Sequence, residues 1–377
     1  MLLRLRGKTE ADISAQRIVS GKSWDEYCDT LKAAGAALVF PGAPTDPFNQ
    51  AEGYRYLARL ARSGLEAFLE NADPRAPVLA RPVHETVKMG SDNPDNYYQN
   101  ATISGQYEYR ISGTRGTVHY LGFGTQKGNY TDGGGMPPTG YIEASQLQLE
   151  PDGSFALLLS CNKPATGNWL PMEPGTNLLI VRQTFADRAT ERIAELKIER
   201  LGGDSHPGMV TPQGLDKGLN TAGLLVAGAS MLFAKWARDF QKHTNQLPRF
   251  SQDVSNAAGG DPNIAYYHSY WTLAPDEALV IDSDIPDCDA WNFQLDNHWL
   301  ESLDYRYFTI HVNKFTAKYR PNGSVRVVVA HQDPGVPNWI NTVGHDCGVM
   351  SWRWIRAKSH PQPEPRVVKL AAVGKLP

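Results

Sequence analysis

The sequence predicts a mainly β protein with helical additions, built from two related β-sandwich modules of the jelly-roll type. The first observation is a repeat: Asp152-Gly153-Ser154 precedes Asn168-Trp169-Leu170, and Asn322-Gly323-Ser324 precedes Asn338-Trp339-Ile340. Both offsets are 170 residues (322 minus 152 and 338 minus 168). Each copy has a turn dipeptide, a run of apolar β-formers, a loop with proline and then Asn-Trp. This common order indicates one duplicated supersecondary unit.

The second observation is a pattern of short β-forming runs separated by Gly, Pro and Asn. The match between the copies extends to residues 120–123 against 291–294 and to 179–182 against 350–353. We expect strands at residues 106–112, 117–123, 147–150, 155–160, 178–185 and 195–200, and again at 267–273, 278–282, 290–296, 315–320, 325–330 and 349–355.

Helical signals precede and separate the two modules. Ser23 could cap a helix over residues 24–35, and Asp46-Pro47 is a strong helix start followed by an amphipathic face that ends before Asn71. Thr211-Pro212 starts a second helical region, which runs to about residue 243 with a break expected near residue 221. The expected organisation is an N-terminal helical segment (1–80), a first module (81–204), a helical linker (205–261), a second module (262–357) and a Pro-rich tail (358–377).

Composition limits the function classes. The chain has 377 residues, of which 41% are hydrophobic, and 37 basic residues nearly balance 40 acidic ones. This balance gives no electrostatic footprint for nucleic acid. The N-terminus lacks the apolar core of a signal peptide, and the most apolar stretch, residues 224–234, is about half the roughly 18 residues that span a bilayer. Four dispersed cysteines form no CxxC pair, so we expect a cytoplasmic protein without membrane contact.

Several familiar chemistries lack their motifs. The sequence has no G-x-S-x-G elbow, no G-x-G-x-x-G after a strand and no H-E-x-x-H. Serine hydrolase, nicotinamide oxidoreductase and metalloprotease activities are therefore disfavoured, and no cofactor is expected. The function classes that remain are acid-base catalysis by His, Asp, Glu and Tyr, and ligand binding without catalysis.

His345 is the first candidate for a catalytic residue. It lies in a glycine-flanked loop, residues 344–348, just before a predicted strand, and imidazole titrates near neutral pH, which suits general acid or base catalysis. Asp333 and His331 of the preceding loop, or the adjacent Asp346, could orient it. Adjacent strand residues point to opposite faces, which disfavours Asp346 as the partner. The alternative is that His345 caps a turn by bonding to the backbone.

The same residues allow a metal-dependent alternative. His331, Asp333 and His345 offer enough nitrogen and carboxylate ligands for a three-ligand site, which would suit zinc or non-haem iron. Their spacing matches no established metal motif, so the main expectation includes no metal.

A second polar cluster covers residues 90–98. Asp95 could serve as an acid or base, while Tyr97 and Tyr98 could line a pocket and donate hydrogen bonds to a substrate. The alternative is a set of tight turns made by Asx residues and proline.

Aromatic residues are dense in the second module. Tyr270, Trp271 and Tyr305 could contact a flat or ring-containing ligand, and Arg353 could hold an anionic group. Most of these aromatic residues are expected in the core. The shared repeat position of Trp169 and Trp339 favours packing roles for both.

Some of these residues carry a family resemblance. Pro337-Asn338-Trp339-Ile340-Asn341-Thr342 with Gly344-His345, followed by Trp352-Arg353-Trp354, resembles the carboxy-terminal signature of the bacterial family of domain of unknown function 1214 (DUF1214). Asn168-Trp169-Leu170-Pro171 with residues 178–182 resembles a weaker copy.

The resemblance implies β-sandwich or jelly-roll modules with helical additions. It also implies a bacterial source of the kind that degrades steroids, aromatics and other hydrophobic compounds. The sequence departs from the family pattern at Asp346-Cys347, so the resemblance implies no role for that pair.

We therefore expect a cofactor-independent hydrolase, lyase or isomerase that acts on a bulky hydrophobic or ring-containing small molecule in a catabolic process. One alternative is a non-catalytic β-sandwich that binds a carbohydrate or lipid-like ligand. Another is an assembly protein that forms a homo-oligomer through an exposed sheet edge.

Overall fold

The structure is a computed structural model that describes residues 7, 9–128, 137–203, 206–257 and 261–376. The chain divides into two compact units. The first comprises Met1–Gly35, Leu57–Val87 and Asn96–Ala229, and the second comprises Ala36–Tyr56, Lys88–Asp95 and Ser230–Pro377. The units are therefore not the contiguous segments that the sequence suggested, because two short N-terminal stretches belong to the second unit.

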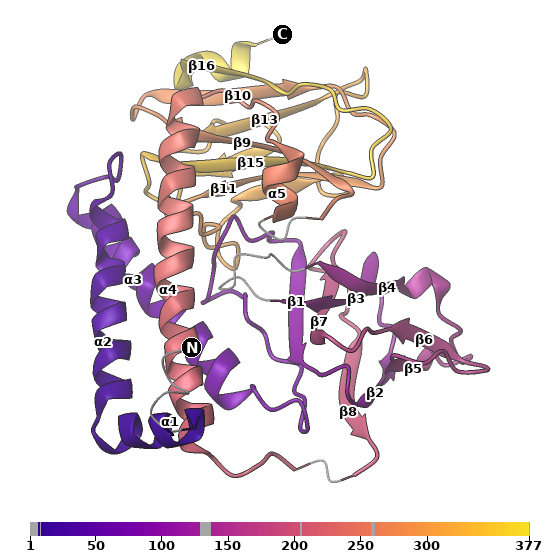
Figure 1. The fold of residues 1–377 in the computed structure, drawn as a ribbon. Helices are drawn as coiled ribbons and strands as arrows, with labels where there is room; N and C mark the ends of the chain where they lie inside the picture. The colour runs from indigo at the N-terminus through magenta and orange to yellow at the C-terminus, as the bar shows by residue number, and fades with distance from the viewer. Residues whose placement is uncertain (1–6, 8, 129–136, 204–205, 258–260, 377) are drawn as a thin grey trace. The chain divides into compact units, whose positions relative to one another are not determined.

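The first unit contains one β-sandwich module (Figure 1). Its two four-stranded sheets have the strand orders β1-β7-β3-β4 and β6-β5-β2-β8. Side chains from both sheets, among them Phe123, Leu157 and Leu179, form its core. The strands are β1 (Asn96–Thr102), β2 (Glu108–Thr114), β3 (Tyr120–Lys127), β4 (Pro138–Glu143), β5 (Ser154–Ser160), β6 (Asn168–Pro171), β7 (Thr176–Thr184) and β8 (Glu195–Leu201).

The second unit contains the other module. Its sheets have the orders β12-β11-β15-β9 and β14-β13-β10-β16, and they lie one above the other in Figure 1. The strands are β9 (Ile264–Thr272), β10 (Glu277–Ser283), β11 (Ala290–Asp296), β12 (His311–Asn313), β13 (Val325–Ala330), β14 (Trp339–Asn341), β15 (Cys347–Ile355) and β16 (Glu364–Lys369).

The two modules have the same topology, strand for strand. Replacing β1 to β8 by β9 to β16 converts the sheet orders of the first module into those of the second. Even the exceptional parallel pair, β5 with β6, has its counterpart in β13 with β14. The predicted pair of related β modules is confirmed.

The repeated Asn-Trp pair has the same hydrogen bonds in both modules. Each asparagine side chain donates to two backbone carbonyl oxygens, namely those of Gln148 and Ala156 for Asn168 and those of Lys318 and Arg326 for Asn338. Each tryptophan Nε1–H donates to the carbonyl oxygen nine residues upstream, 3.2 Å away for Trp169 and 3.0 Å for Trp339. These side chains satisfy backbone groups that the loop would otherwise leave unpaired, which explains why the duplication kept them.

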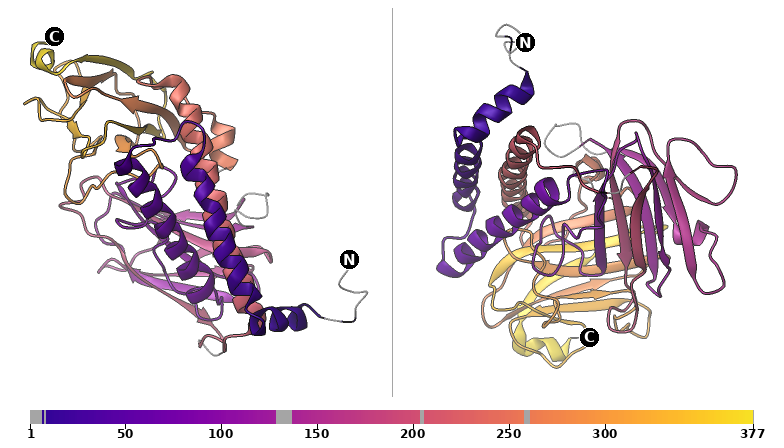
Figure 2. Two further views of the ribbon diagram at one scale, coloured as in Figure 1. Left: turned by 90° about the vertical axis from the view of Figure 1, so that its left-hand side faces the viewer. Right: turned by 90° about the horizontal axis from the view of Figure 1, so that it is seen from below.

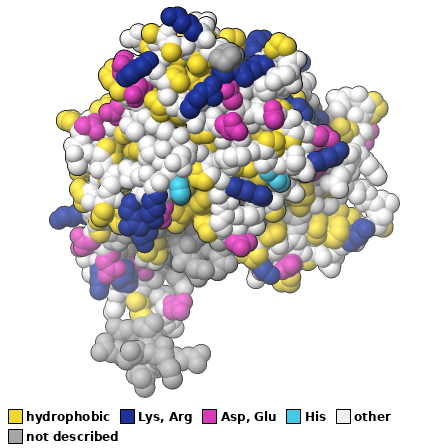
Figure 3. All heavy atoms as spheres, turned by 90° about the horizontal axis from the view of Figure 1, so that it is seen from above, with side chains coloured by type: hydrophobic (Ala, Val, Ile, Leu, Met, Phe, Trp, Pro, Cys, Tyr) yellow, Lys and Arg dark blue, Asp and Glu magenta, His cyan; other side chains and the backbone are white. Residues whose placement is uncertain are grey.

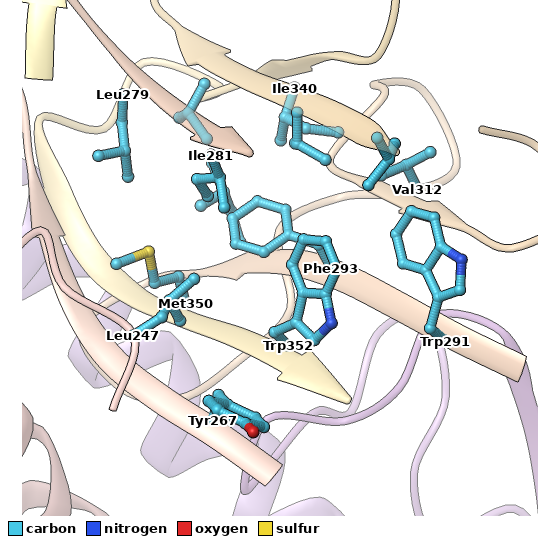
Figure 4. Close-up of a cluster of buried hydrophobic side chains, with 14 of the residues drawn as sticks. Leu247, Tyr267, Leu279, Ile281, Trp291, Phe293, Val312, Ile340, Met350 and Trp352 are labelled. Atoms are coloured by element: carbon cyan, nitrogen blue, oxygen red, sulfur yellow. The ribbon is translucent and has the colours of Figure 1, made fainter. Parts of the chain in front are cut away.

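The core of the second module is rich in aromatic residues. Trp291, Phe293 and Trp352 lie between its two sheets with Ile281 and Ile340 (Figure 4), and all five are fully buried. The rings of Trp291 and Trp352 are stacked with centroids 4.9 Å apart. Because strand residues alternate between faces, these core residues direct their neighbours to the opposite face of the sheet.

Helices belong to both units, and Figure 2 shows the long ones from two directions. They are α1 (Glu10–Val19), α2 (Lys22–Ala34), α3 (Pro47–Leu65), α4 (Pro212–Phe240) and α5 (Gln252–Ala257). The Asp46 cap is present, since its Oδ1 accepts from Asn49 N at 3.0 Å. α4 is continuous, so the break expected near Thr221 is wrong: its hydroxyl bonds to Lys217 O within the helix. Within the described residues, no helix combines the length and apolarity needed to cross a bilayer.

The expected strands and tail differ from the structure in several places, and β1, β4, β6, β12 and β14 were not expected. Residues 147–150 and 315–320 form no strand, and they contain the backbone groups that bond to Asn168 and Asn338 instead. The segment expected as a Pro-rich tail includes β16, which pairs with β10. Proline is tolerated there because β16 is an edge strand.

On the face of the molecule shown in Figure 3, basic and acidic side chains are interspersed.

Candidate functional site

The sheet β12-β11-β15-β9 has an unusual face opposite its aromatic core. Asn292, Gln294 and Asp296 alternate with core residues along β11, and each is completely buried. Arg353 on β15 and His311 on β12 belong to the same face by strand register. We call these five residues the polar face. Buried polar groups are costly unless they are hydrogen-bonded.

Lys88–Asp95, which we call the strap, provides most of those hydrogen bonds. Its backbone is tied to the sheet by Ser91 N, which donates to Leu300 O at 2.8 Å, and by Gln294 Nε2, which donates to Asp92 O at 2.9 Å. Lys88 Nζ donates to the carbonyl oxygens of Ser302 and Leu303 at 2.6 and 2.8 Å. Polar contacts therefore attach the strap to the sheet.

Asp95, at the end of the strap, forms a dyad with His311. His311 Nε2 donates to Asp95 Oδ1 at 3.1 Å, and Asn313 Nδ2 donates to the same oxygen at 2.8 Å. Asn292 Nδ2 donates to Asp95 Oδ2 at 2.9 Å. Burial by itself raises the pKa of Asp95, but the charge and hydrogen bond of His311 and the two amide donors outweigh it, and the pKa lies below its usual value.

The other ring nitrogen of His311 is unoccupied by the described part of the chain. No described residue hydrogen-bonds to Nδ1, which is shielded from solvent, although the side chain as a whole is 21% exposed. When the ring is neutral, an ionised Asp95 can only accept, so Nε2 bears the proton and Nδ1 has a lone pair. In the Asp-His pairs of general base catalysis, a carboxylate likewise fixes one ring nitrogen and leaves the other free to take a proton.

Arg353 connects the dyad to the rest of the polar face. Its Nη1 donates to Gln294 Oε1 at 2.5 Å and to Asn292 Oδ1 at 3.2 Å, and its Nη2 donates to Ser91 O at 2.6 Å. The sequence predicts that Arg353 holds an anionic group of a substrate. In the structure its guanidinium instead donates these hydrogen bonds to groups of the protein itself. One of them, the Asn292 side chain, is also bound to Asp95.

Asp296 lies at the other end of the polar face. It accepts from Ser91 Oγ at 2.5 Å and from Gln294 Nε2 at 2.6 Å. Burial raises the pKa of Asp296 to about 7, since the two donors and Arg353 compensate only in part and Asp92 adds a negative charge nearby. The pKa of Asp92 is also raised by burial, against the opposing effects of Lys88, Ser302 and Arg353.

The polar face is only partly present in the corresponding part of the first module, where Arg182 lies opposite Gly122 as Arg353 lies opposite Asn292. The strand registers place Gly122 and Gly124 at the positions of Asn292 and Gln294, and Tyr141 at the position of His311. The arginine is thus repeated in both modules, whereas Asn292, Gln294 and His311 are specific to the second module. This difference favours a functional role for these three residues over a structural one.

His345 has a different carboxylate partner from those expected. Its Nε2 donates to Glu52 Oε2 at 2.6 Å, and its Nδ1 donates to Thr342 O at 2.9 Å. Burial raises the pKa of Glu52, but His345, Arg55 and Asn297 outweigh that effect and the pKa is lowered. Both ring nitrogens are used within the protein, which favours the alternative role of His345 as a turn cap.

The other three candidates near His345 are also held by local contacts or exposed. His331 Nε2 donates to Leu273 O at 3.2 Å, and its Nδ1 accepts from the Thr342 hydroxyl at 2.9 Å. Asp333 is exposed and accepts from Gly335 N in a turn, and the exposed Asp346 is not the partner of His345. Across the described ranges, no group of three His, Cys, Asp or Glu has the geometry of a metal site.

These loops nevertheless border an open pocket of about 590 Å³. His331, His345 and Asp346 contribute to its wall with Gly344 and the segment 272–275. The sequence therefore identified residues that line one pocket, although the histidine nitrogens there are engaged.

The aromatic candidates separate into different environments. Trp271 is fully buried in the core, and Tyr270 is 5% exposed with its hydroxyl 2.9 Å from His298 Nδ1. Lys88 Nζ lies 4.5 Å from the ring centroid of Tyr305. Tyr97 and Tyr98 lie on β1 of the first unit, where Arg81 stacks on Tyr97 and Asn96 Nδ2 donates to the Tyr98 hydroxyl.

Comparison with known proteins gives a family but no activity. The family model described as "Protein of unknown function (DUF1214)" matches residues 138–186, which lie in the first module and include its Asn-Trp pair. The residues that resemble the family most, 337–345 and 352–354, lie in the second copy and outside this match. No curated protein matches the chain.

Solved structures that match the chain include two bacterial proteins. An uncharacterized protein from Burkholderia cenocepacia is 51% identical with a TM-score of 0.91, and the match covers 95% of this chain and 99% of that one. A protein from Vibrio parahaemolyticus is 12% identical with a TM-score of 0.47, covering 84% of this chain and 98% of that one. The chain therefore belongs to the same family as the Burkholderia protein, and its residues 138–186 match the DUF1214 model.

Proposed function

We propose that the protein is a cofactor-independent acid-base enzyme in which Asp95 and His311 form the proton-transfer dyad. The observation that carries this proposal is the asymmetry of the His311 ring: Nε2 is fixed by the Asp95 carboxylate, while no described residue hydrogen-bonds to Nδ1. The role of base is thereby assigned to His311 rather than to His345.

The dyad can remove one proton and return it. His311 Nδ1 takes a proton from a C–H acid or from an attacking water, and the resulting imidazolium keeps its Nε2–H bond to Asp95. The negative charge of Asp95, held by Asn292 and Asn313, stabilises that imidazolium. Isomerisation, elimination and hydrolysis can all begin with this step. Because Nδ1 is shielded from solvent, a substrate must displace a neighbouring group to reach it.

Exposed aromatic side chains favour a hydrophobic or ring-containing substrate. Tyr307, Phe308 and Phe315 lie on either side of β12 in the chain and are 75%, 44% and 43% exposed. Aromatic side chains that line a site can stack on flat ligands, and these three belong to the segments that flank His311 in the chain. The expected catabolic role rests on this substrate class.

A panel of cyclic ketones and aromatic esters in D₂O tests the proposal. Proton NMR reports both deuterium incorporation next to a carbonyl and ester cleavage. We expect His311→Gln and Asp95→Asn to lower the wild-type rate by at least about 100-fold, the contribution typical of a positioned base. Asp333→Asn, an exposed carboxylate of the same module, is the matched control and should leave the rate unchanged.

Wild-type turnover by a folded His311→Gln protein would contradict the assignment. A wild-type protein that is inactive on the whole panel would favour the second candidate function, ligand binding without turnover. The observation behind that candidate is the open pocket of about 590 Å³ at His331 and His345, whose engaged ring nitrogens suit binding better than catalysis.

A further inference from the structure

Arg182 on β7 of the first module (Figure 1) is the counterpart of Arg353, but its guanidinium has no partner among the described residues. Both arginines lie on the sheet face opposite the core, and each has a tyrosine opposite it on the neighbouring strand, Tyr98 or Tyr266. Arg353 donates to two side-chain amide oxygens and one backbone carbonyl oxygen. Arg182 is partly exposed and, within the part of the chain that the structure describes, donates no hydrogen bond and forms no ion pair. Its five N–H donors are therefore available to a ligand.

The amide side chains that hold Arg353 have no equivalent around Arg182. Gly122 and Gly124 stand at the positions of the asparagine and the glutamine of the second module. A Cβ built on Gly124 would be no closer than 3.9 Å to its nearest neighbours, so a further group fits there. A glycine inside a strand allows a ligand to approach the backbone closely. The first module thus has room at the place that Gln294 fills in the second.

A carboxylate of the same face, Glu143, does not serve as the counter-ion of Arg182. Glu143 lies opposite Gly122 on β4, and its Oε1 accepts from the Tyr141 hydroxyl at 2.8 Å. The Tyr141 hydroxyl also bonds to that of Tyr120. The Tyr120 hydroxyl covers Gly122, because a Cβ there would collide with it. By strand order Gly122 separates Glu143 from Arg182, so the charge of the guanidinium is not balanced on this face by a described residue.

We propose that this face of the first module binds an aromatic monocarboxylate, with the carboxylate on Arg182 and the ring over Gly124 beside Tyr141. The two oxygens of a carboxylate match two parallel N–H groups of a guanidinium, and they take the place of the planar amide and carbonyl oxygens that Arg353 contacts. Tyr141 is 46% exposed, and its Cδ2 lies 3.9 Å from the position of a Cβ on Gly124. An aromatic ring of the ligand can therefore pack against the tyrosine ring. The site belongs to the first module and does not depend on the proposed activity of the second.

Titration of the full-length chain with benzoate tests this site. Calorimetry gives the affinity, and the nitrogen-15 NMR signal of the Arg182 Nε–H group should shift on binding. We expect Arg182→Gln to weaken binding at least about 10-fold, as the loss of a hydrogen-bonded charge pair does. Arg110→Gln is the matched control and should bind as the wild type does, because Arg110 lies on the other sheet of the same module, where it is paired with Glu199.

Gly124→Gln tests the site while Arg182 stays in place. The variant reproduces the glutamine of the second module at a position where φ is not positive and a Cβ fits, so the protein should fold. The new amide oxygen can accept from Arg182, and the side chain fills the space proposed for the ring. Benzoate affinity should fall at least about 10-fold. Wild-type affinity in a folded Gly124→Gln or Arg182→Gln protein would overturn the site.

Two smaller anions test the ligand class. Acetate has the carboxylate without the ring, and inorganic phosphate has charge without the planar pair of oxygens. Both should bind more weakly than benzoate to the wild type. A wild-type protein that does not bind benzoate, or that binds acetate or phosphate as tightly as benzoate, would overturn the aromatic monocarboxylate as the ligand.

Discussion

Replacing Asp296 by Asn should stabilise the protein, and the gain should depend on pH. Asn is the same size and can keep both contacts, because its Oδ1 can accept from Gln294 and its Nδ2 can donate to Ser91 Oγ. It cannot ionise. The native pKa of about 7 exceeds the ordinary value of 3.8, so the wild type loses stability as the pH rises between these values.

The magnitude follows from the same shift. About three pH units at 1.36 kcal/mol each give a penalty of roughly 4 kcal/mol at pH 8, and almost none at pH 4. The variant should therefore match the wild type at pH 4 and exceed its free energy of unfolding by several kcal/mol at pH 8.

Urea unfolding followed by tryptophan fluorescence is the assay. Trp291, Trp352 and Trp354 are buried in the core of the same module and report its unfolding. A stability difference that is equal at both pH values, or that has the opposite sign at pH 8, would refute the reasoning.

Three further predictions concern the pair at His345, the repeated asparagines and the dyad. Glu52→Gln should destabilise the protein by roughly 3 kcal/mol at pH 7, because the buried His345 loses its carboxylate partner. The pKa of Glu52 is lowered from its ordinary value of 4.5 in the folded protein. Denaturation experiments should therefore show a smaller difference between variant and wild type as the pH falls from 4.5 through that lowered pKa. Asn168→Ala and Asn338→Ala should each cost roughly 2 kcal/mol, and a large difference between them in urea unfolding would contradict their equivalence. Asp95→Asn should reduce turnover at least as much as His311→Gln. The amide of Asn can donate to Nε2 of His311 and so favour the tautomer with the proton on Nδ1. A wild-type kcat in the Asp95→Asn variant would count against the dyad.

The fold was largely predictable because its strongest signal is local and repeated. The Asn-Trp pair occurs at the same place in both copies and makes equivalent backbone contacts, so a match at fixed spacing carried real structural information. Elements with weaker local signals were missed. β16 lies among prolines, and residues 147–150 look like a strand although their backbone is bound by Asn168.

The candidate site was predictable only in part. Asp95 and Arg353 were named from local clusters, and the structure connects both through Asn292. His311 was missed because its partner is 216 residues away in the chain, and a single sequence does not show such pairs. A usable signal did exist: polar residues at Asn292 and Gln294 replace glycines of the first copy, which marks the face where the two modules differ.

His345 shows the opposite error. Its glycine-flanked loop and family signature drew attention to it, but the carboxylate that binds it, Glu52, comes from α3. Loop composition indicated an important histidine and could not indicate which nitrogens were engaged. That distinction needs three-dimensional contacts.

Nitrogen-15 NMR of the His311 ring tests the central claim most directly. With the ring in its neutral form, the account predicts a proton on Nε2 and a lone pair on Nδ1 in the wild type, and a loss of this preference in Asp95→Asn. A proton on Nδ1 in the wild-type protein, or a tautomer that does not respond to the loss of the Asp95 carboxylate, would contradict the assignment of His311 as the base.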